Sequence, residues 1–407
     1  MRFKTDTLSE RVMLLVASVS VCFPLSARSE ETAFDYGEIE GLFEPAGVRD
    51  GYLSFGLIDV AFGSYSDWKQ NFSKKYGLSY LIENRLIMQW GDGTDIYDNE
   101  LNLIARQDFL GSVPGEFSFN IWGQFANTLG SNTGAEFQSD LGVLSPLNGG
   151  NSGPDTSNQI LQMFAVEYVS PDERWRVQAG KLALRTLVNL NRYAHGDSET
   201  FFSPMLGNNP VVPYTALLGI GVYGQYQTDN WSLSGLVRAP DTDLGLSTDA
   251  WRDGDRGYII EYALTPEIKG IGAGVYRLTW SLDEANASLP RMETWSLSLD
   301  QDFGERFGGF FRYAEADNTI RDFERRVAVG FQLKKPFGFE HDRIGVGAWW
   351  GDPTDNSLND ERGFEVFYRA QVSPYLQITP NVQFVDDPAL SNESSEVIFG
   401  LRLRLNL

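Results

Sequence analysis

The sequence of 407 residues predicts an all-β fold: a transmembrane, antiparallel, up-and-down β-barrel of about 16 strands that follows a short N-terminal helix. Three observations lead to this prediction. Apolar and polar residues alternate with a period of two in many segments from about residue 78 to the C-terminus. Tight turns and long polar links follow one another in turn. No later segment approaches the roughly 18 apolar residues of a transmembrane helix, so the chain can cross a membrane only as a closed barrel.

The first 27 residues are expected to be an export signal. Arg2 and Lys4 give a basic start, residues 12–25 are mostly apolar, and Ala27 ends a plausible cleavage site. The apolar run, with roughly 14 residues, is short for a membrane span. A membrane anchor is the alternative interpretation. The single cysteine, Cys22, lies in this segment, so the rest of the chain has no thiol for disulfide or thiolate chemistry.

Residues 28–65 are expected to form an extension ahead of the barrel, and residues 66–77 a short periplasmic helix. A serine and a glycine at the two ends of this helix are plausible caps. Trp68, Phe72 and Tyr76 recur every fourth residue and give the helix one apolar stripe. We therefore expect the helix to pack against, or plug, the mouth of the barrel. The preceding stretch YLSFGLIDVAF has a strand-like composition.

The barrel itself is predicted to occupy residues 78–407. Its last segment, EVIFGLRLRLNL, illustrates the pattern, because Leu401 and Leu403 share one parity while Arg402 and Arg404 share the other. Successive strand residues point to opposite faces, so the apolar face would meet acyl chains and the cationic face would meet water inside the barrel. Sixteen such segments begin near residues 78, 101, 117, 161, 175, 218, 231, 258, 271, 294, 307, 325, 344, 364, 377 and 397.

The links between these segments alternate in length. Tight links lie at 170–174, 228–230, 265–270, 302–306 and 373–376, and longer polar links lie at 127–158, 185–216, 240–256, 282–291, 314–324, 352–362 and 386–396. Short turns on one side and long loops on the other are typical of outer-membrane barrels. A soluble β-sandwich is the alternative, but it does not need this rhythm. An even number of strands places both termini on the periplasmic side.

The charge balance argues against one class of partner. The formal net charge of −22 becomes −23 when residues 1–27, which hold three basic and two acidic side chains, are removed. Binding to nucleic acid depends on basic side chains that neutralise phosphates, so no nucleic-acid partner is expected. An acidic surface suits exposed loops that hold divalent cations among anionic lipid head groups, and equally suits ordinary solubility.

Catalytic and metal chemistry are not expected either. The chain has two histidines, His195 and His341, and neither lies in a pattern that pairs a nucleophile with its base. The Cys/His spacing of a metal site is absent, although DDPALSNESSE is acidic enough to bind Ca²⁺ loosely. The glycine-rich stretch LNGGNSG lacks the spacing of a phosphate-binding loop. We therefore expect no enzyme, no cofactor and no metal site.

Several segments resemble the carbohydrate-selective porins of the OprB type. The C-terminal block FEVFYRAQVSPYLQITPNVQFVDDPALSNESSEVIFGLRLRL is similar to the closing strands of that family and is the most specific part of the match. DWKQNFSKKYGLSY (67–80) resembles the family's helix before the first strand. WRVQAGKL (175–182) and FFSPMLGNNPVVP (201–213) resemble its Gly-Lys-Leu strand and its Phe/Asn/Pro loop. The resemblance extends over roughly residues 65–407.

This resemblance implies a 16-stranded channel that passes sugars across the outer membrane of a Gram-negative bacterium by passive, facilitated diffusion. It also implies a homotrimer, contact with lipid and lipopolysaccharide, and recognition of the C-terminal strand by the barrel-assembly machinery. Three features depart from the family pattern. The chain ends on Leu407 rather than on an aromatic residue, Glu340, His341 and Asp342 replace a usual Arg-x-x-Asp, and residues 28–64 look like an extension.

Two other functions of the same barrel stay open. One is a general diffusion pore, or a porin for another small solute, which would conduct without saturable block by sugars. The other is a barrel that binds surface polysaccharide without conducting, which would show no single-channel current.

A sugar channel needs hydrogen-bonding side chains for hydroxyl groups and aromatic faces for sugar rings in its narrow part. A charge on the lipid-facing side costs about 2–4 kcal/mol at the membrane midplane, so charged strand residues are assigned to the lumen. The strand candidates for lumen and constriction are Arg106, Asn120, Trp122, Gln124, Glu167, Arg176, Arg238, Glu261, Arg312, Arg369, Arg402 and Arg404. Asn102, Gln178, Trp349, Glu365 and Gln383 share the inward parity.

Two long links, 127–158 and 185–216, are the candidates to fold inward and narrow the channel. The second joins the fifth and sixth predicted strands, which is the position of the constriction loop in general porins. It adds Arg185, Arg192 and Tyr193 to the candidate site. An ordinary exposed loop is the alternative interpretation of this link.

Overall fold

The computed structural model describes residues 51, 53, 57–109, 114–148, 157–194, 199–212, 219–241, 244–285, 290–317 and 321–407. The predicted export signal, most of the predicted extension and His195 lie outside the described residues. Among the helices of the described part, none is long and apolar enough to span a membrane.

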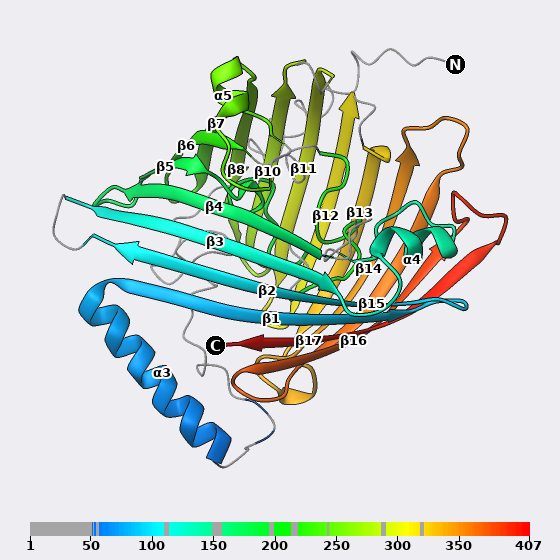
Figure 1. Cartoon of the computed structure of the whole chain (residues 1–407), viewed down its shortest axis with the longest axis horizontal. Helices are drawn as coiled ribbons and strands as arrows, with labels where there is room; N and C mark the ends of the chain where they lie inside the picture. The colour runs from blue at the N-terminus through cyan, green and yellow to red at the C-terminus, as the bar shows by residue number, and fades with distance from the viewer. Residues whose placement is uncertain are drawn as a thin grey trace.

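One antiparallel sheet of 17 strands dominates the described part of the chain (Figure 1). Its strands are β1 (Leu78–Trp90), β2 (Asp95–Asp108), β3 (Glu116–Thr128), β4 (Ser157–Val169), β5 (Trp175–Lys181), β6 (Ile220–Gln227), β7 (Trp231–Arg238), β8 (Gly257–Leu264), β9 (Glu267–Ile268), β10 (Gly272–Asp283), β11 (Met292–Phe303), β12 (Phe307–Asp317), β13 (Phe323–Lys334), β14 (Arg343–Pro353), β15 (Glu361–Gln371), β16 (Leu376–Asp386) and β17 (Ser395–Asn406).

The sheet closes on itself because β1 pairs with both β2 and β17. β9 has only two residues and pairs with the start of β10, while β8 and β10 pair directly, so the barrel wall consists of 16 long strands. The predicted fold class and strand number are therefore confirmed. The second strand begins at Asp95 rather than near residue 101, and a turn of only four residues, 91–94, separates it from β1.

Burial alternates along the strands in the way that the sequence parity predicts. In β17, Arg402 and Arg404 are buried, whereas Val397 and Phe399 are 43% and 56% exposed. The outer face is therefore apolar and the inner face polar, as in a membrane barrel. Ile398, the apolar exception on the inner face, belongs to a cluster of buried hydrophobic side chains inside the barrel.

That buried cluster is formed by two segments that fold into the barrel. The first comprises residues 133–148 and contains α4 (Gly134–Asp140). The second comprises residues 182–194 and 199–212 and contains the short 3₁₀ helix η1 (Leu184–Thr186). Phe137 from the first, and Phe201 and Leu206 from the second, are 1% exposed or less. They pack with inward wall residues such as Phe310. The described parts of both long links predicted to fold inward therefore do so, and we call residues 182–194 and 199–212 the inserted segment.

A 20-residue helix, α3 (Leu57–Tyr76), precedes β1. The predicted helix 66–77 was wrong at its start, because part of the strand-like stretch before it is helical. Phe62 and Tyr65 extend the aromatic stripe backward at helical spacing, so the apolar face does not stop at Ser66. The predicted end is confirmed by Gly77, whose φ is 69° and whose amide donates to the Ser73 carbonyl at 2.8 Å.

α3 packs against the rim of the barrel, at the end where the C-terminus also lies (Figure 1). We call this the terminal end, and the opposite end, which carries α5 (Asp249–Asp253), the loop end. The Tyr65 and Tyr80 hydroxyl groups are 2.8 Å apart, and the Lys69 ammonium lies 4.8 Å from the centre of the Tyr80 ring. Tyr80 alternates with the buried Leu81 and so belongs to the outer face of β1.

Candidate functional site

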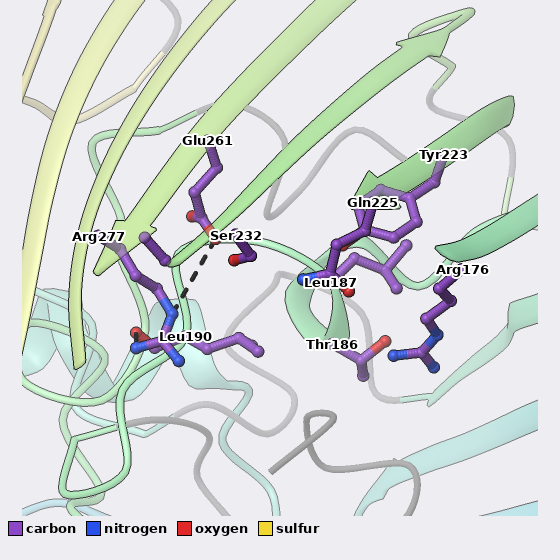
Figure 2. A pocket seen from close by; sticks show the side chains of 10 residues that line it. Arg176, Thr186, Leu187, Leu190, Tyr223, Gln225, Ser232, Glu261 and Arg277 are labelled. Atoms are coloured by element: carbon purple, nitrogen blue, oxygen red, sulfur yellow. Dashed lines mark hydrogen bonds and ion pairs between the residues drawn. The ribbon is translucent and has the colours of Figure 1, made fainter. Parts of the chain in front are cut away.

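A small pocket lies inside the barrel between the inserted segment and the wall from β5 to β10 (Figure 2). Its volume of about 20 Å³ holds one or two water molecules. The inserted segment supplies one side of the pocket and inward wall residues supply the other. The lining residues are Arg176, Thr186, Leu187, Leu190, Tyr223, Gln225, Ser232, Glu261, Ala263 and Arg277.

Strand register connects three wall residues of the pocket, Arg176, Gln225 and Glu261, through inward positions on neighbouring strands. Arg176 of β5 lies opposite Gln225 of β6, and Gln225 lies opposite Ser234 of β7. Ser234 in turn lies opposite Glu261 of β8, and Glu261 lies opposite Thr279 of β10. Because opposite residues in a sheet share a face, one inward position on each of five strands forms a continuous polar row.

A buried carboxylate orients the arginine on one side of the pocket. The Arg176 Nε atom donates to Glu167 Oε2 at 2.9 Å, and Gln178 donates to the same oxygen. The Arg106 guanidinium donates to the other oxygen of Glu167 at 3.4 Å. Because Glu167 is only 2% exposed, these donors compensate for the cost of burying its charge. Arg176 is thereby held in place beside the pocket.

The opposite side of the pocket is formed by Glu261 and Arg277, whose Oε1 and Nε atoms lie 4.0 Å apart (Figure 2). Glu261 Oε2 accepts hydrogen bonds from the Thr279 hydroxyl and from the backbone amide of Asn189, both at 2.6 Å. Arg277 donates to the Leu190 carbonyl at 3.1 Å and to Asp300 at 3.2 Å. The same two side chains therefore face the pocket and hold the inserted segment.

This arrangement combines hydrogen-bonding groups with an apolar surface and nearly balanced charges. Arg176 and Arg106 adjoin Glu167, while Arg277 adjoins Glu261 and Asp300. Three guanidinium groups thus adjoin three carboxylates, and Arg192 adds a fourth guanidinium group at Asp300. Tyr223, Leu187 and Leu190 add aromatic and aliphatic surface. Such a lining suits neutral polar solutes that carry hydroxyl groups on an apolar ring.

Every strand residue predicted to line the lumen lies on the inner face, where it is buried or only slightly exposed. These residues are Arg106, Asn120, Trp122, Gln124, Glu167, Arg176, Arg238, Glu261, Arg312, Arg369, Arg402 and Arg404. Of this set, only Arg176 and Glu261 line the pocket directly. Arg238 instead pairs with Asp283 at 2.6 Å near the loop end.

Several of the predicted arginines hold the inserted segment rather than the pocket. Arg312 donates to the backbone carbonyls of Asn189 at 2.9 Å and Ala194 at 2.5 Å. Arg402 donates to the Thr200 carbonyl at 2.9 Å, and its guanidinium lies 4.5 Å from the centre of the Phe202 ring. The wall thus binds the backbone of the segment through charge-assisted hydrogen bonds.

The loop candidates are also engaged with the wall. Arg192 pairs with Asp300 at 2.5 Å and with Asp302 at 2.8 Å, and the Tyr193 hydroxyl donates to Asp302. The Arg185 guanidinium lies 4.5 Å from the centre of the Trp122 ring. Asn120 and Gln124 lie on the same inner face of β3 as Trp122.

One carboxylate of the inserted segment reaches the closing seam of the barrel. Glu199 accepts a hydrogen bond from Arg369 of β15 at 2.5 Å and another from Arg404 of β17. Arg404 also pairs with Glu83 of β1 at 2.5 Å. This cluster connects the segment to both strands of the β1–β17 pair.

Comparison with known proteins identifies the family. The family described as "Carbohydrate-selective porin, OprB family" matches residues 134–407, which is more than half of the chain. The chain belongs to this family. Its barrel is similar to the high-pH structure of Pseudomonas putida OprB, with 14% identity and a TM-score of 0.69 over 84% of this chain and 97% of that one. The low-pH structure of the same protein gives 14% identity and a TM-score of 0.57 over 85% and 97%.

Two curated relatives match this OprB-family chain more distantly. An uncharacterized protein of Aquifex aeolicus (strain VF5) is 25% identical over 221 residues, which are 53% of this chain and 60% of the relative. Porin AaxA of Chlamydia felis (strain Fe/C-56) is 21% identical over 266 residues, which are 62% of this chain and 59% of the relative. The chain therefore spans about 60% of the length of these relatives.

Part of the pocket in this OprB-family barrel was not predicted from the sequence. Tyr223, Gln225, Ser232 and Arg277 were not among the candidates, although inward parity was sufficient to include them. Arg277, for example, shares its parity with the buried Thr279 on β10. Thr186, Leu187 and Leu190 carry no such signal, because their place at the pocket depends on how the inserted segment folds.

Proposed function

We propose that this chain forms a passive channel for neutral or weakly charged sugars in the outer membrane of a Gram-negative bacterium. The observation that carries the proposal is the pocket between the inserted segment and the β5–β10 wall, with its hydroxyl-binding groups and balanced charges. Membership of the carbohydrate-selective porin family supports the same substrate class.

The small volume of the pocket bears on how a sugar would pass through the barrel. Because a pocket for one or two waters is smaller than a sugar ring, we propose that residues 186–190 shift away from the wall when a sugar binds there. Arg176 would then donate to sugar hydroxyl oxygens, and Glu261 would accept hydrogen bonds from sugar hydroxyl groups. Binding and release involve no covalent step, so we propose a channel without catalytic activity.

We also propose partners for the barrel in the outer membrane. The apolar outer face suits contact with outer-membrane lipid and lipopolysaccharide, and the C-terminal β17 suits recognition by the barrel-assembly machinery. We further propose a homotrimer, following the family resemblance, with residues 1–27 removed as an export signal.

Single-channel recording in a planar bilayer tests the proposal. We expect refolded protein to give current steps that monosaccharides and disaccharides block in a saturable way. Arg176→Met should raise the sugar concentration for half-block about tenfold, because a hydrogen bond to a charged group contributes roughly 1.5–3 kcal/mol. Glu167 keeps Arg106 and Gln178 as partners in this variant.

The control is Arg252→Met, since Arg252 is an exposed residue of α5 at the loop end and does not line the pocket. Current steps that no sugar affects would favour a general diffusion pore. A folded barrel that gives no current would favour the polysaccharide-binding alternative.

A further inference from the structure

The helix before the barrel has an aromatic surface that the barrel does not cover. We infer that α3 is an interfacial helix that lies in the phospholipid leaflet at the terminal end of the barrel, with an anionic phospholipid surface as its partner. The inference goes beyond transport, and it rests on the proposed membrane location of the barrel.

The aromatic side chains of α3 form a continuous row. The Trp68 and Phe72 ring centres are 5.3 Å apart, and the Phe72 and Tyr76 ring centres are 4.8 Å apart. Trp68 is 53% exposed and Tyr76 is 52% exposed. Indole and phenol groups have an apolar body and a polar tip, so they favour the boundary between acyl chains and head groups.

The position of α3 places this row beside the lipid-facing surface. Tyr65 and Lys69 contact Tyr80, which lies on the outer face of β1. Nearer the start of the helix, the centre of the Phe62 ring lies 4.5 Å from the centre of the Tyr375 ring, in the turn between β15 and β16. The barrel has a second aromatic row at its terminal end, where Trp175, Tyr226, Trp231 and Tyr262 contact one another at ring distances of 4.8–6.2 Å. The aromatic surface of α3 therefore lies at the same end of the barrel as this second aromatic row, next to the apolar outer face.

The charge of the helix fits an anionic surface. α3 carries Lys69, Lys74 and Lys75 against Asp59 and Asp67, whereas the whole chain has a net charge of −22. Lys74 and Lys75 are exposed in the last turn, where the helix meets the rim of the barrel. A local basic cluster on an acidic protein is attracted to phosphatidylglycerol, and each lysine near such a surface strengthens binding roughly fivefold.

A polarity-sensitive fluorescent label tests the inference on the refolded chain without residues 1–27, which has no other cysteine. One variant carries the label at Trp68→Cys, and the matched control carries it at Gln70→Cys. Gln70 lies about 160° around the helix from Trp68. In vesicles with phosphatidylglycerol, we expect a blue shift and quenching by a lipid-borne quencher for the first label only.

The role of the lysines is tested by lowering the phosphatidylglycerol fraction in phosphatidylcholine vesicles. Combined Lys74→Gln and Lys75→Gln substitutions should weaken the lipid contact of the Trp68 label about 25-fold, while Lys269→Gln at another exposed turn of the terminal end should not. A Trp68 label that stays in water in every vesicle, while heat-modifiable gel mobility shows an inserted barrel, overturns the inference and leaves the channel proposal intact. A barrel that never inserts overturns both.

Discussion

At the scale of single residues, buried arginines of the wall act as binding sites for backbone carbonyls. Arg312 is 1% exposed and binds carbonyls at both ends of the Asn189–Ala194 stretch. Arg326 is fully buried and donates to the Met205 carbonyl at 2.8 Å. A guanidinium group has five donors in a fixed plane, so one side chain can bind several carbonyls of an irregular segment.

Arg312→Met should therefore loosen the inserted segment. The carbonyls that it binds would lose a charge-assisted donor in a buried site, at a cost of roughly 1–3 kcal/mol for each group left unsatisfied. We expect a lower unfolding temperature in heat-modifiable gel assays and a larger, noisier single-channel current. Arg252→Met is the exposed control. An unchanged current would show that Arg312 does not restrain the segment.

Wall carboxylates complement these arginines by binding backbone amides. Glu365 is fully buried and accepts hydrogen bonds from the amides of Phe202 at 2.7 Å and Ser203 at 2.9 Å. Glu361 does the same for Leu144 at 3.0 Å and Ser145 at 2.8 Å in the first inward-folding segment. Both inward-folding segments are thus held by their backbones.

At the scale of elements, the strands were predictable and the lumen contacts were not. The alternation with a period of two predicted the inner and outer faces because most outward positions are apolar and most inward positions are polar. The start of β2 was not predicted because Asp98 and Glu100 are acidic, and acidic residues are typical of loops. In the structure both side chains are buried inside the barrel, where they have polar partners. Glu100, for example, pairs with Arg85 of β1 at 2.6 Å.

The contacts of the inserted segment were even less predictable from the sequence than the start of β2. Its inward fold was predicted from length and position, but its contacts join residues that lie far apart in the chain. Asn191 Nδ2 donates to the Ser298 hydroxyl at 3.1 Å across 107 residues of sequence. No local pattern specifies such a pair, so the pocket side formed by Leu187 and Leu190 follows only from the folded molecule.

If residues 186–190 must move for a sugar to pass, fixing the segment should stop transport. A short thiol cross-linker between Asn191→Cys and Ser298→Cys would hold the segment on the wall. We expect cross-linked channels to lose sugar flux in a liposome-swelling assay and to regain it when a cleavable linker is reduced. The two single-cysteine variants are the controls. Undiminished flux after complete cross-linking would mean that the segment need not move.

The packing of α3 should depend on pH through Lys69. Burial lowers the pKa of the Lys69 ammonium to about 8, below its ordinary value of about 10.4. Between these values the packed helix binds fewer protons than the released helix, so packing should strengthen as the pH rises from 8 toward 10. Burial also raises the pKa of the Tyr65 hydroxyl, so packing should weaken again as the pH rises above 10.

Temperature-dependent anisotropy of the label at Gln70→Cys measures the release of α3. Its midpoint should be higher at pH 9.5 than at pH 7.5. Lys69→Met should remove this difference, and Lys74→Met, which changes an exposed lysine, should keep it. A midpoint that falls between these two pH values would contradict the assigned direction.

At the scale of the whole molecule, the barrel wall is not equally tall all round. β5 has seven residues and β6, β7 and β8 have eight each, whereas the other long strands have 11–14. Eight residues in a strand tilted by about 40° rise about 20 Å, compared with an apolar band of about 25 Å in typical outer-membrane barrels. The strands on this side of the barrel are therefore shorter than the apolar band of a typical outer-membrane barrel.

This mismatch predicts that the barrel is most stable in thin bilayers. Unfolding temperatures measured in phosphatidylcholine vesicles with acyl chains of increasing length should peak at short chains and then fall, because the lipid must thin next to β5–β8. A control barrel of uniform strand length should peak at longer chains. Stability that increases steadily with chain length would contradict the prediction.

The cluster around Arg404 also has a consequence for how the barrel selects its final register. Adjacent strand residues face opposite sides, so a slip of one residue in the β1–β17 pairing would turn Arg404 toward the acyl chains. A slip of two residues would keep its face but would move its guanidinium about 7 Å along the seam, away from Glu83 and Glu199. Only the observed pairing, with Arg404 opposite Arg85, satisfies the cluster. The strand that closes the barrel thus carries side chains whose ion pairs form only when closure has the correct register.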